Sequence, residues 1–180
     1  MKTLAHLRNF FGHIRSDRKG TAAIEFAIFV GFLSIALLNV VDLARFLYQR
    51  MQVENAAEMG VMAAFEACDL NHLPATTNCP GLDTAVTTAI RSTSLGTGVS
   101  LQSGSPSEGW YCVNSSDALQ YVSSVSSKPA DCSAAGEPSL QPGDYIKVQV
   151  TYTFTPLFTG VSVGGLLPTT IAKTTLLRLQ

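Results

Sequence analysis

The most prominent pattern in the chain is an apolar run that follows a basic stretch near the N-terminus. Residues 21–41, TAAIEFAIFVGFLSIALLNVV, contain one ionisable side chain, that of Glu25. A helix needs about 20 apolar residues to cross the hydrocarbon core of a bilayer. The run therefore predicts a transmembrane helix, and the alternative is a buried helix of a soluble protein.

After residue 41 the pattern becomes amphipathic without a break. Apolar residues recur at i, i+3 and i+4, while most charged residues lie elsewhere, and no proline interrupts residues 21–70. This predicts one helix over 21–70, about 75 Å long at 1.5 Å per residue, with 42–70 as an amphipathic extension and Gly60 as a place where it bends. The apolar positions of the extension are Leu43, Phe46, Leu47, Val53, Ala57, Val61, Ala64, Phe65 and Cys68.

The remaining residues, 71–180, predict a small β-rich domain. Alternating apolar and polar residues over 145–155 give the clearest strand, and 169–179 predict a final strand. Further expectations are a loop over 71–81, a short helix over 83–92, a strand over 99–101, a flexible turn over 103–109, a hairpin of 110–113 with 119–122, and a glycine-rich turn over 160–165. The fold class is therefore α+β, with a long N-terminal helix packed on a small antiparallel sheet.

The charge distribution predicts which end of the apolar run faces the cytoplasm. Residues 1–20 carry five basic side chains and one acidic side chain, a net charge of +4, whereas residues 21–180 carry seven basic and twelve acidic side chains, a net charge of −5. The positive-inside bias predicts a basic cytoplasmic leader over 1–20 and an outer domain across the membrane. A cleaved secretory signal is the competing interpretation, but the apolar run is long for one and residues 42–45, DLAR, form a poor cleavage site. The acidic main body argues against nucleic-acid binding.

Four cysteines follow the apolar run, namely Cys68, Cys79, Cys112 and Cys132. Their even number predicts disulfides in an oxidising compartment, with free buried thiols as the alternative. Loop length favours Cys68 with Cys79 and Cys112 with Cys132 among three pairings. Their spacing fits no metal site, and we expect no metal, cofactor, small-molecule substrate or catalytic residue, since no catalytic motif is present. The acidic residues Asp83, Glu108, Asp117, Asp131, Glu137 and Asp144 are predicted to be solvated in loops.

Glu25 needs an explanation, because a carboxylate inside a bilayer costs several kcal/mol unless it is neutralised or paired. It could be protonated or reach the headgroups. The surrounding residues 19–26, KGTAAIEF, resemble the prepilin processing signal of type IV pilins, most closely that of the TadE-like pseudopilins of the tight-adherence (Tad) pilus. The resemblance covers residues 18–70, and the tail from 145 onward is more weakly similar to TadE and TadG proteins.

The resemblance implies a minor pilin that is cut by a prepilin peptidase between Gly20 and Thr21, which makes Glu25 the fifth mature residue, followed by Phe26. Its implied partners are the lipid bilayer, the peptidase, other pilins and Tad assembly proteins. It implies a single-pass protein of the bacterial inner membrane with a periplasmic outer domain, and leaves open its incorporation into a surface pilus. The alternative is an uncleaved TadG-like envelope protein whose outer domain binds a partner.

Three small residues add a helix-packing hypothesis. Ala23, Ala27 and Gly31 recur every four residues, which places them on one face of the predicted membrane helix. Such a stripe lets a second helix approach closely. Chance is the alternative, because alanine is common in membrane helices.

Overall fold

The computed structural model describes residues 18–158, 160 and 162–180, which form two compact units. The first unit contains the described residues up to Ala44 together with Pro156–Leu167, and the second contains Arg45–Thr155 with Pro168–Gln180. Helix α2 (Arg18–Ala67) contributes residues to both units. Most of the predicted basic leader, residues 1–17, lies outside the described residues.

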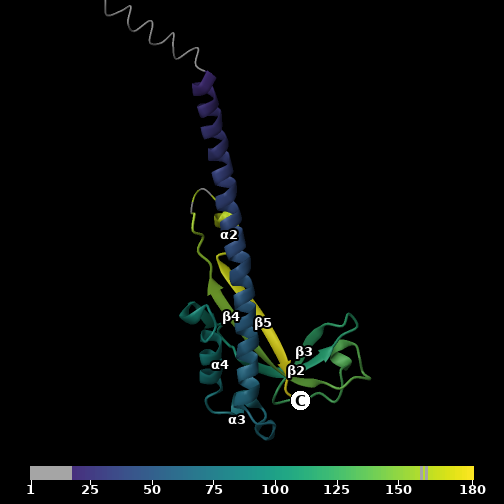
Figure 1. Cartoon of the computed structure of the whole chain (residues 1–180). Coiled ribbons are helices and arrows are strands. Elements are labelled where there is room, and N and C mark those ends of the chain that lie inside the picture. The colour runs from purple at the N-terminus through teal and green to yellow at the C-terminus, as the bar shows by residue number, and fades with distance from the viewer. Residues whose placement is uncertain (1–17, 159, 161) are drawn as a thin grey trace, which may run out of the picture. The chain divides into compact units, whose positions relative to one another are not determined.

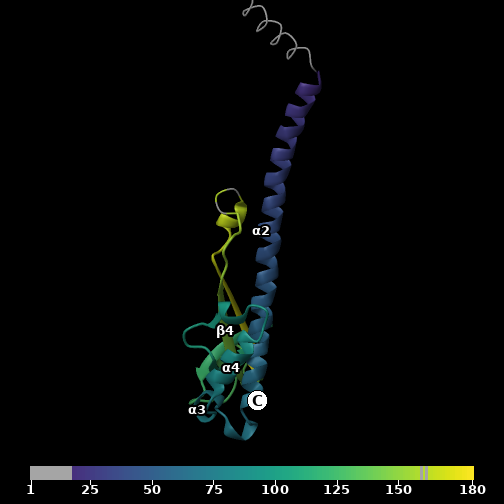
Figure 2. The same cartoon turned by 60° about the vertical axis from the view of Figure 1, so that its left-hand side comes forward.

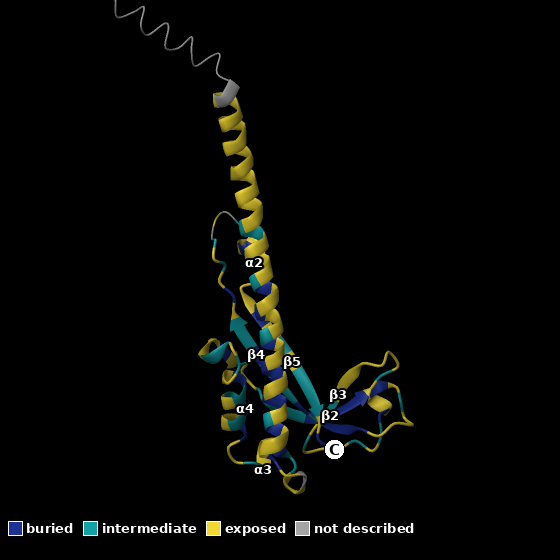
Figure 3. Cartoon of the chain, in the orientation of Figure 1, coloured by how far each residue is buried: buried dark blue, intermediate teal, exposed yellow. Residues whose placement is uncertain are grey.

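The long helix predicted over 21–70 is confirmed as α2, which begins and ends three residues earlier than predicted. Helix α2 contains no proline and ends at Ala67. The short helix η1 (Leu70–His72) follows, and the side chain of Asp69 caps it by accepting a hydrogen bond from the backbone N–H of Asn71. The N-terminal part of α2 contains an apolar window with a mean hydropathy of 2.3 and no buried residue, seen as the exposed upper helix in Figure 3. By length and composition, this part of α2 can cross a membrane.

The second unit contains an antiparallel sheet built around one long strand, β4 (Gly143–Thr153) (Figures 1 and 2). Strand β5 (Thr170–Arg178) pairs with β4 over nearly its whole length. β2 (Ser107–Val113) pairs with the first half of β4, and β1 (Val99–Leu101) pairs with the second half. Strand β3 (Leu119–Ser124) pairs with β2 to form the predicted hairpin.

The core of this unit lies where α2 and helix α4 (Leu82–Arg91) meet the sheet. Ile146, Val148 and Val150 of β4 are fully buried, as their alternation predicts. A Cβ atom at Gly60 of α2 would lie 2.8 Å from Ile90 Cγ2 and 3.0 Å from Val148 Cγ1. Gly60 therefore permits close packing inside a continuous helix, and the expected bend at Gly60 stays a prediction.

Several local predictions differ from the structure. The predicted loop 71–81 contains the one-turn helix α3 (Ala75–Asn78), and the predicted flexible turn 103–109 includes the start of β2. The predicted apolar face of the extension is confirmed at most of its positions, and Ala56 adds to it, whereas Leu43, Leu47 and Phe65 are exposed. The predicted positions that are buried are Phe46, Val53, Ala57, Val61, Ala64 and Cys68. Short 3-10 helices occur at η2 (Gly96–Gly98), η3 (Ser133–Ala135) and η4 (Val163–Leu166).

Candidate functional site

The predicted processing site lies in the first turn of α2. Gly20 and Thr21 are both helical and exposed, so the Gly20–Thr21 peptide bond follows the helix start at Arg18. A Cβ atom at Gly20 would meet nothing within 4 Å. The bond is therefore unobstructed by described residues, but a peptidase that binds an extended substrate must first unwind this turn.

Glu25 and Phe26 follow one turn later on α2, and both side chains are exposed. No described residue forms a hydrogen bond or an ion pair with the Glu25 carboxylate. A carboxylate at this depth in a membrane helix needs a proton or a cationic partner. Any such cationic partner must come from outside the described residues.

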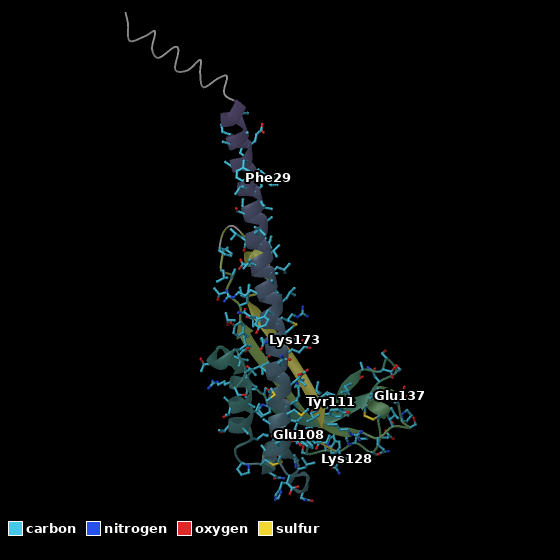
Figure 4. The ribbon with its side chains drawn as sticks, in the orientation of Figure 1. Phe29, Glu108, Tyr111, Lys128, Glu137 and Lys173 are labelled. Carbon is cyan, nitrogen blue, oxygen red and sulfur yellow. A yellow bond between two sulfur atoms is a disulfide. The ribbon has the colours of Figure 1, made fainter. Side chains whose placement is uncertain are left out.

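The small-residue stripe of Ala23, Ala27 and Gly31 lies on one exposed side of α2. A Cβ atom at Gly31 would meet nothing within 4 Å. Large apolar side chains such as Phe29 project from the same part of the helix, as Figure 4 shows. The stripe is open to a second helix, as close packing in a membrane requires.

Two polar residues near the end of the apolar run bind a distant part of the chain. Asp42 is fully buried in the structure, and it accepts hydrogen bonds from the Leu157 N–H at 2.9 Å and the Ser162 hydroxyl. Asn39 accepts a hydrogen bond from the Val163 N–H. Sequence reasoning missed this contact, although two polar residues three positions apart on one helix face were a usable signal.

Both disulfides lie in the second unit. Cys68 and Cys79 pair with Cα atoms 5.6 Å apart, and Cys112 and Cys132 pair with Cα atoms 5.7 Å apart, which are the two pairs that loop length favours. The first links the residue after α2 to the residue after α3. The second forms a small core with Ala135 and the partly buried Val122. Each disulfide therefore closes one irregular segment against a regular element.

Two of the acidic residues expected in solvated loops are strand residues with structural contacts. Glu108 in β2 accepts hydrogen bonds from the backbone N–H groups of Ala75 and Thr76, at 2.9 and 2.8 Å. Asp144 in β4 has only 3% of its side chain exposed. Burial, and secondarily the Glu108 carboxylate, raises the pKa of Asp144 to about 6, while Lys128 opposes this shift. Figure 4 labels Glu108, Tyr111 and Lys128 in the lower part of the view. The prediction of a solvated loop residue is wrong for Asp144, which is a buried strand residue, and Glu108 is a half-buried strand residue.

The comparison with known families concerns the helix. Residues 20–62 match the family model described as TadE-like protein. The resemblance seen in the sequence is thus confirmed for this segment. No curated protein matches the chain, and no solved structure matches it. The TadE-like segment begins at Gly20 and lies entirely within α2, so the sheet lies outside the match.

The TadE-like segment supports a protein associated with the Tad pilus. In the described part of the chain, one helix is long and apolar enough to cross a membrane, which together with this segment indicates a single-pass membrane protein. Among the described residues, no group of three or more histidine, cysteine or acidic side chains is arranged to hold a metal ion. The features with a functional interpretation are therefore concentrated along α2.

Proposed function

We propose that this protein is a TadE-like minor pilin, or pseudopilin, that is cleaved after Gly20 by a prepilin peptidase and takes part in assembling a Tad-type pilus. Its basic leader lies in the cytoplasm and its outer domain in the periplasm. The observation that carries the proposal is the TadE-like match, which starts at Gly20, the residue preceding the expected cut.

The Glu25 carboxylate, which has no partner among residues 18–158, 160 and 162–180, supports this proposal. Cleavage before Thr21 creates an ammonium group at the N-terminus of the membrane helix, four residues from Glu25. In a low-dielectric setting the two charges stabilise each other, within one chain or between neighbouring subunits. Pairing between subunits would fix the axial position of one helix relative to the next.

The outer part of α2 also supports assembly through this helix. On the side facing away from the sheet it exposes a series of apolar side chains, namely Leu47, Tyr48, Met51, Met59 and Met62. Methionine-rich apolar surfaces adapt to irregular partners. An exposed series of this kind on one helix marks an interaction surface, and neighbouring pilin helices are the partners that the proposal implies.

Cleavage is tested by determining the N-terminus of the membrane-extracted protein by mass spectrometry, in cells with and without prepilin peptidase. We expect a mature chain that starts at Thr21 only when the peptidase is present. If residues 1–20 remain attached in both strains, the protein is an uncleaved envelope component of the TadG-like kind. A chain that starts near Ala44 in both strains would instead indicate ordinary signal peptidase.

The assembly role of Glu25 is tested with Glu25→Ala. We expect normal membrane insertion and normal cleavage but strongly reduced recovery of the protein in sheared pilus fractions, because the new ammonium group loses its partner. Asp83→Ala is the control, since Asp83 is an exposed acidic residue of α4, outside the proposed assembly surface of α2. Equal pilus recovery of both variants and the wild type would refute the role of Glu25.

A further inference from the structure

A second apolar segment of the chain is bound to α2 near residue 41, where the apolar run of the helix ends. The segment Pro156–Leu167 belongs to the same compact unit as the N-terminal part of α2. It is bound there by Asp42 and Asn39, which lie one helical turn apart. Asp42 also accepts a hydrogen bond from the Phe158 N–H at 3.3 Å. The segment's depth along the helix is therefore set by specific hydrogen bonds.

That depth coincides with the membrane boundary. The apolar run ends at residue 41, and a run of this length matches the thickness of the hydrocarbon core. Asn39 and Asp42 thus lie at the level where the helix leaves the bilayer. Asp42 accepts hydrogen bonds from the segment, and these donors allow a carboxylate to remain at this level.

The segment presents apolar side chains at this level and no charge. The exposed fractions are 55% for Leu157, 47% for Val163 and 86% for Leu166. The sequence has no charged residue from Pro156 to Ala172. Exposed leucines without neighbouring charges are unfavourable in water and favourable in the headgroup and acyl boundary region.

We propose that Leu157, Val163 and Leu166 insert into the membrane surface on the side of the β-sheet domain, so that the protein has a second membrane contact beside α2. The partner is the lipid bilayer itself. The contact limits rotation of α2 about its own axis, because only one side of the helix carries the segment. It requires that α2 crosses the bilayer, and it does not depend on cleavage or on pilus assembly.

The test uses a fluorescent probe on the full chain in phosphatidylcholine nanodiscs that hold one copy each. All four native cysteines are disulfide-bonded, so an introduced cysteine is labelled selectively. The probe is attached to Leu166→Cys, with Ser115→Cys in an exposed turn as the aqueous control and Leu33→Cys as the membrane control. Quenching by lipid-borne doxyl groups and by aqueous iodide is then compared.

We expect the probe at 166 to be quenched several-fold more by doxyl groups near the headgroups than the probe at 115, and to be shielded from iodide. Quenching at 166 by iodide alone would overturn the proposal, provided that the probe at 33 is quenched by lipid. The same probe is also measured in vesicles that hold several copies. Shielding that appears in these vesicles but not in the single-copy nanodiscs would assign the surface to a protein partner and would also overturn the proposal.

Two glycines provide a matched pair of variants for the anchoring contact. A Cβ atom at Gly164 would lie 2.8 Å from Asp42 Oδ2 and 2.9 Å from Pro156 Cβ, whereas a Cβ atom at Gly165 would meet nothing within 4 Å. We expect Gly164→Ala to reduce doxyl quenching of the probe at 166 several-fold and Gly165→Ala to leave it unchanged. Equal quenching in both variants would show that the Asp42 contact does not set the depth of the segment.

Discussion

Asp144 offers a direct test of how the outer domain responds to pH. Its carboxyl group is buried, and one of its oxygens, Oδ1, has no hydrogen-bond partner among the residues that the structure describes. Burial and the neighbouring Glu108 carboxylate both disfavour its ionised form. Asp144→Asn keeps the shape of the side chain and removes its charge at every pH.

The sign and the size of the effect follow from the pKa values. The pKa of Asp144 is about 6 in the folded protein against an ordinary value of 3.8, so the folded state retains a proton that the unfolded state releases between these pH values. The free energy of unfolding therefore falls as the pH rises through this window and is lowest above about pH 6. A pKa difference of about 2 corresponds to about 3 kcal/mol at most. We expect about 1–2 kcal/mol, because the effective dielectric constant around a buried group in a protein is well above that of a dry interior.

The assay is denaturant unfolding of the full chain in detergent, followed by the fluorescence of Trp110. This is the only tryptophan in the sequence, it is buried, and it lies directly opposite Asp144 on β2. We expect Asp144→Asn to be more stable than the wild type by about 1–2 kcal/mol at pH 7 and similar to it near pH 4. Asp117→Asn is the matched control, since Asp117 lies in an exposed turn.

Two results would refute this reasoning. One is a wild-type protein whose stability does not decrease between pH 4 and pH 7. The other is an Asp144→Asn variant that is less stable than the wild type at pH 7, which would mean that the ionised carboxylate makes a favourable interaction in the folded state. A shift of equal size in Asp117→Asn would assign the effect to net charge.

Two further predictions use the same unfolding assay. Gly60→Ala is expected to lower the free energy of unfolding by about 1–3 kcal/mol, because the added methyl group overlaps Ile90 and Val148. Gly31→Ala, in the same helix but in open space, should leave the denaturant midpoint unchanged, and a similar loss in both variants would contradict the packing argument. Replacing Cys112 and Cys132 together with serine is expected to cost about 3 kcal/mol, since the disulfide closes a loop with a sequence separation of 20. An unchanged midpoint would show that this loop is already restricted in the unfolded chain.

The elements with strong periodicity could be predicted from the sequence. The alternation that defines β4 and the unbroken apolar pattern of α2 both depend on local spacing, and both elements occur where expected. The fold class follows from these two elements. The position of α4 was also predicted to within one residue, because its apolar residues recur at helical spacing.

Other features depend on which strands become neighbours, and local pattern does not contain that information. The burial of Asp144 follows from the register of β2 against β4, in which Trp110 lies opposite Asp144. The contact of Asp42 with Leu157 joins residues that are 115 positions apart. The exposed face of α2 at Leu47 likewise depends on where the sheet packs. The roles of Gly20, Thr21 and Glu25 stay predictions, since they concern a peptidase and neighbouring subunits.

The central place of β4 has a consequence for how this protein is made. Its two neighbours on one edge precede it in the sequence, and its other edge pairs with β5, which follows it in the sequence. The ion pair between Lys173 of β5 and Glu54 of α2 joins residues 119 positions apart. The sheet is therefore complete only after β5 has been synthesised, and until then β4 lacks the partner strand on one of its edges. A chain truncated before β5 would lose the partner strand of β4 and expose an apolar helix to proteolysis or aggregation.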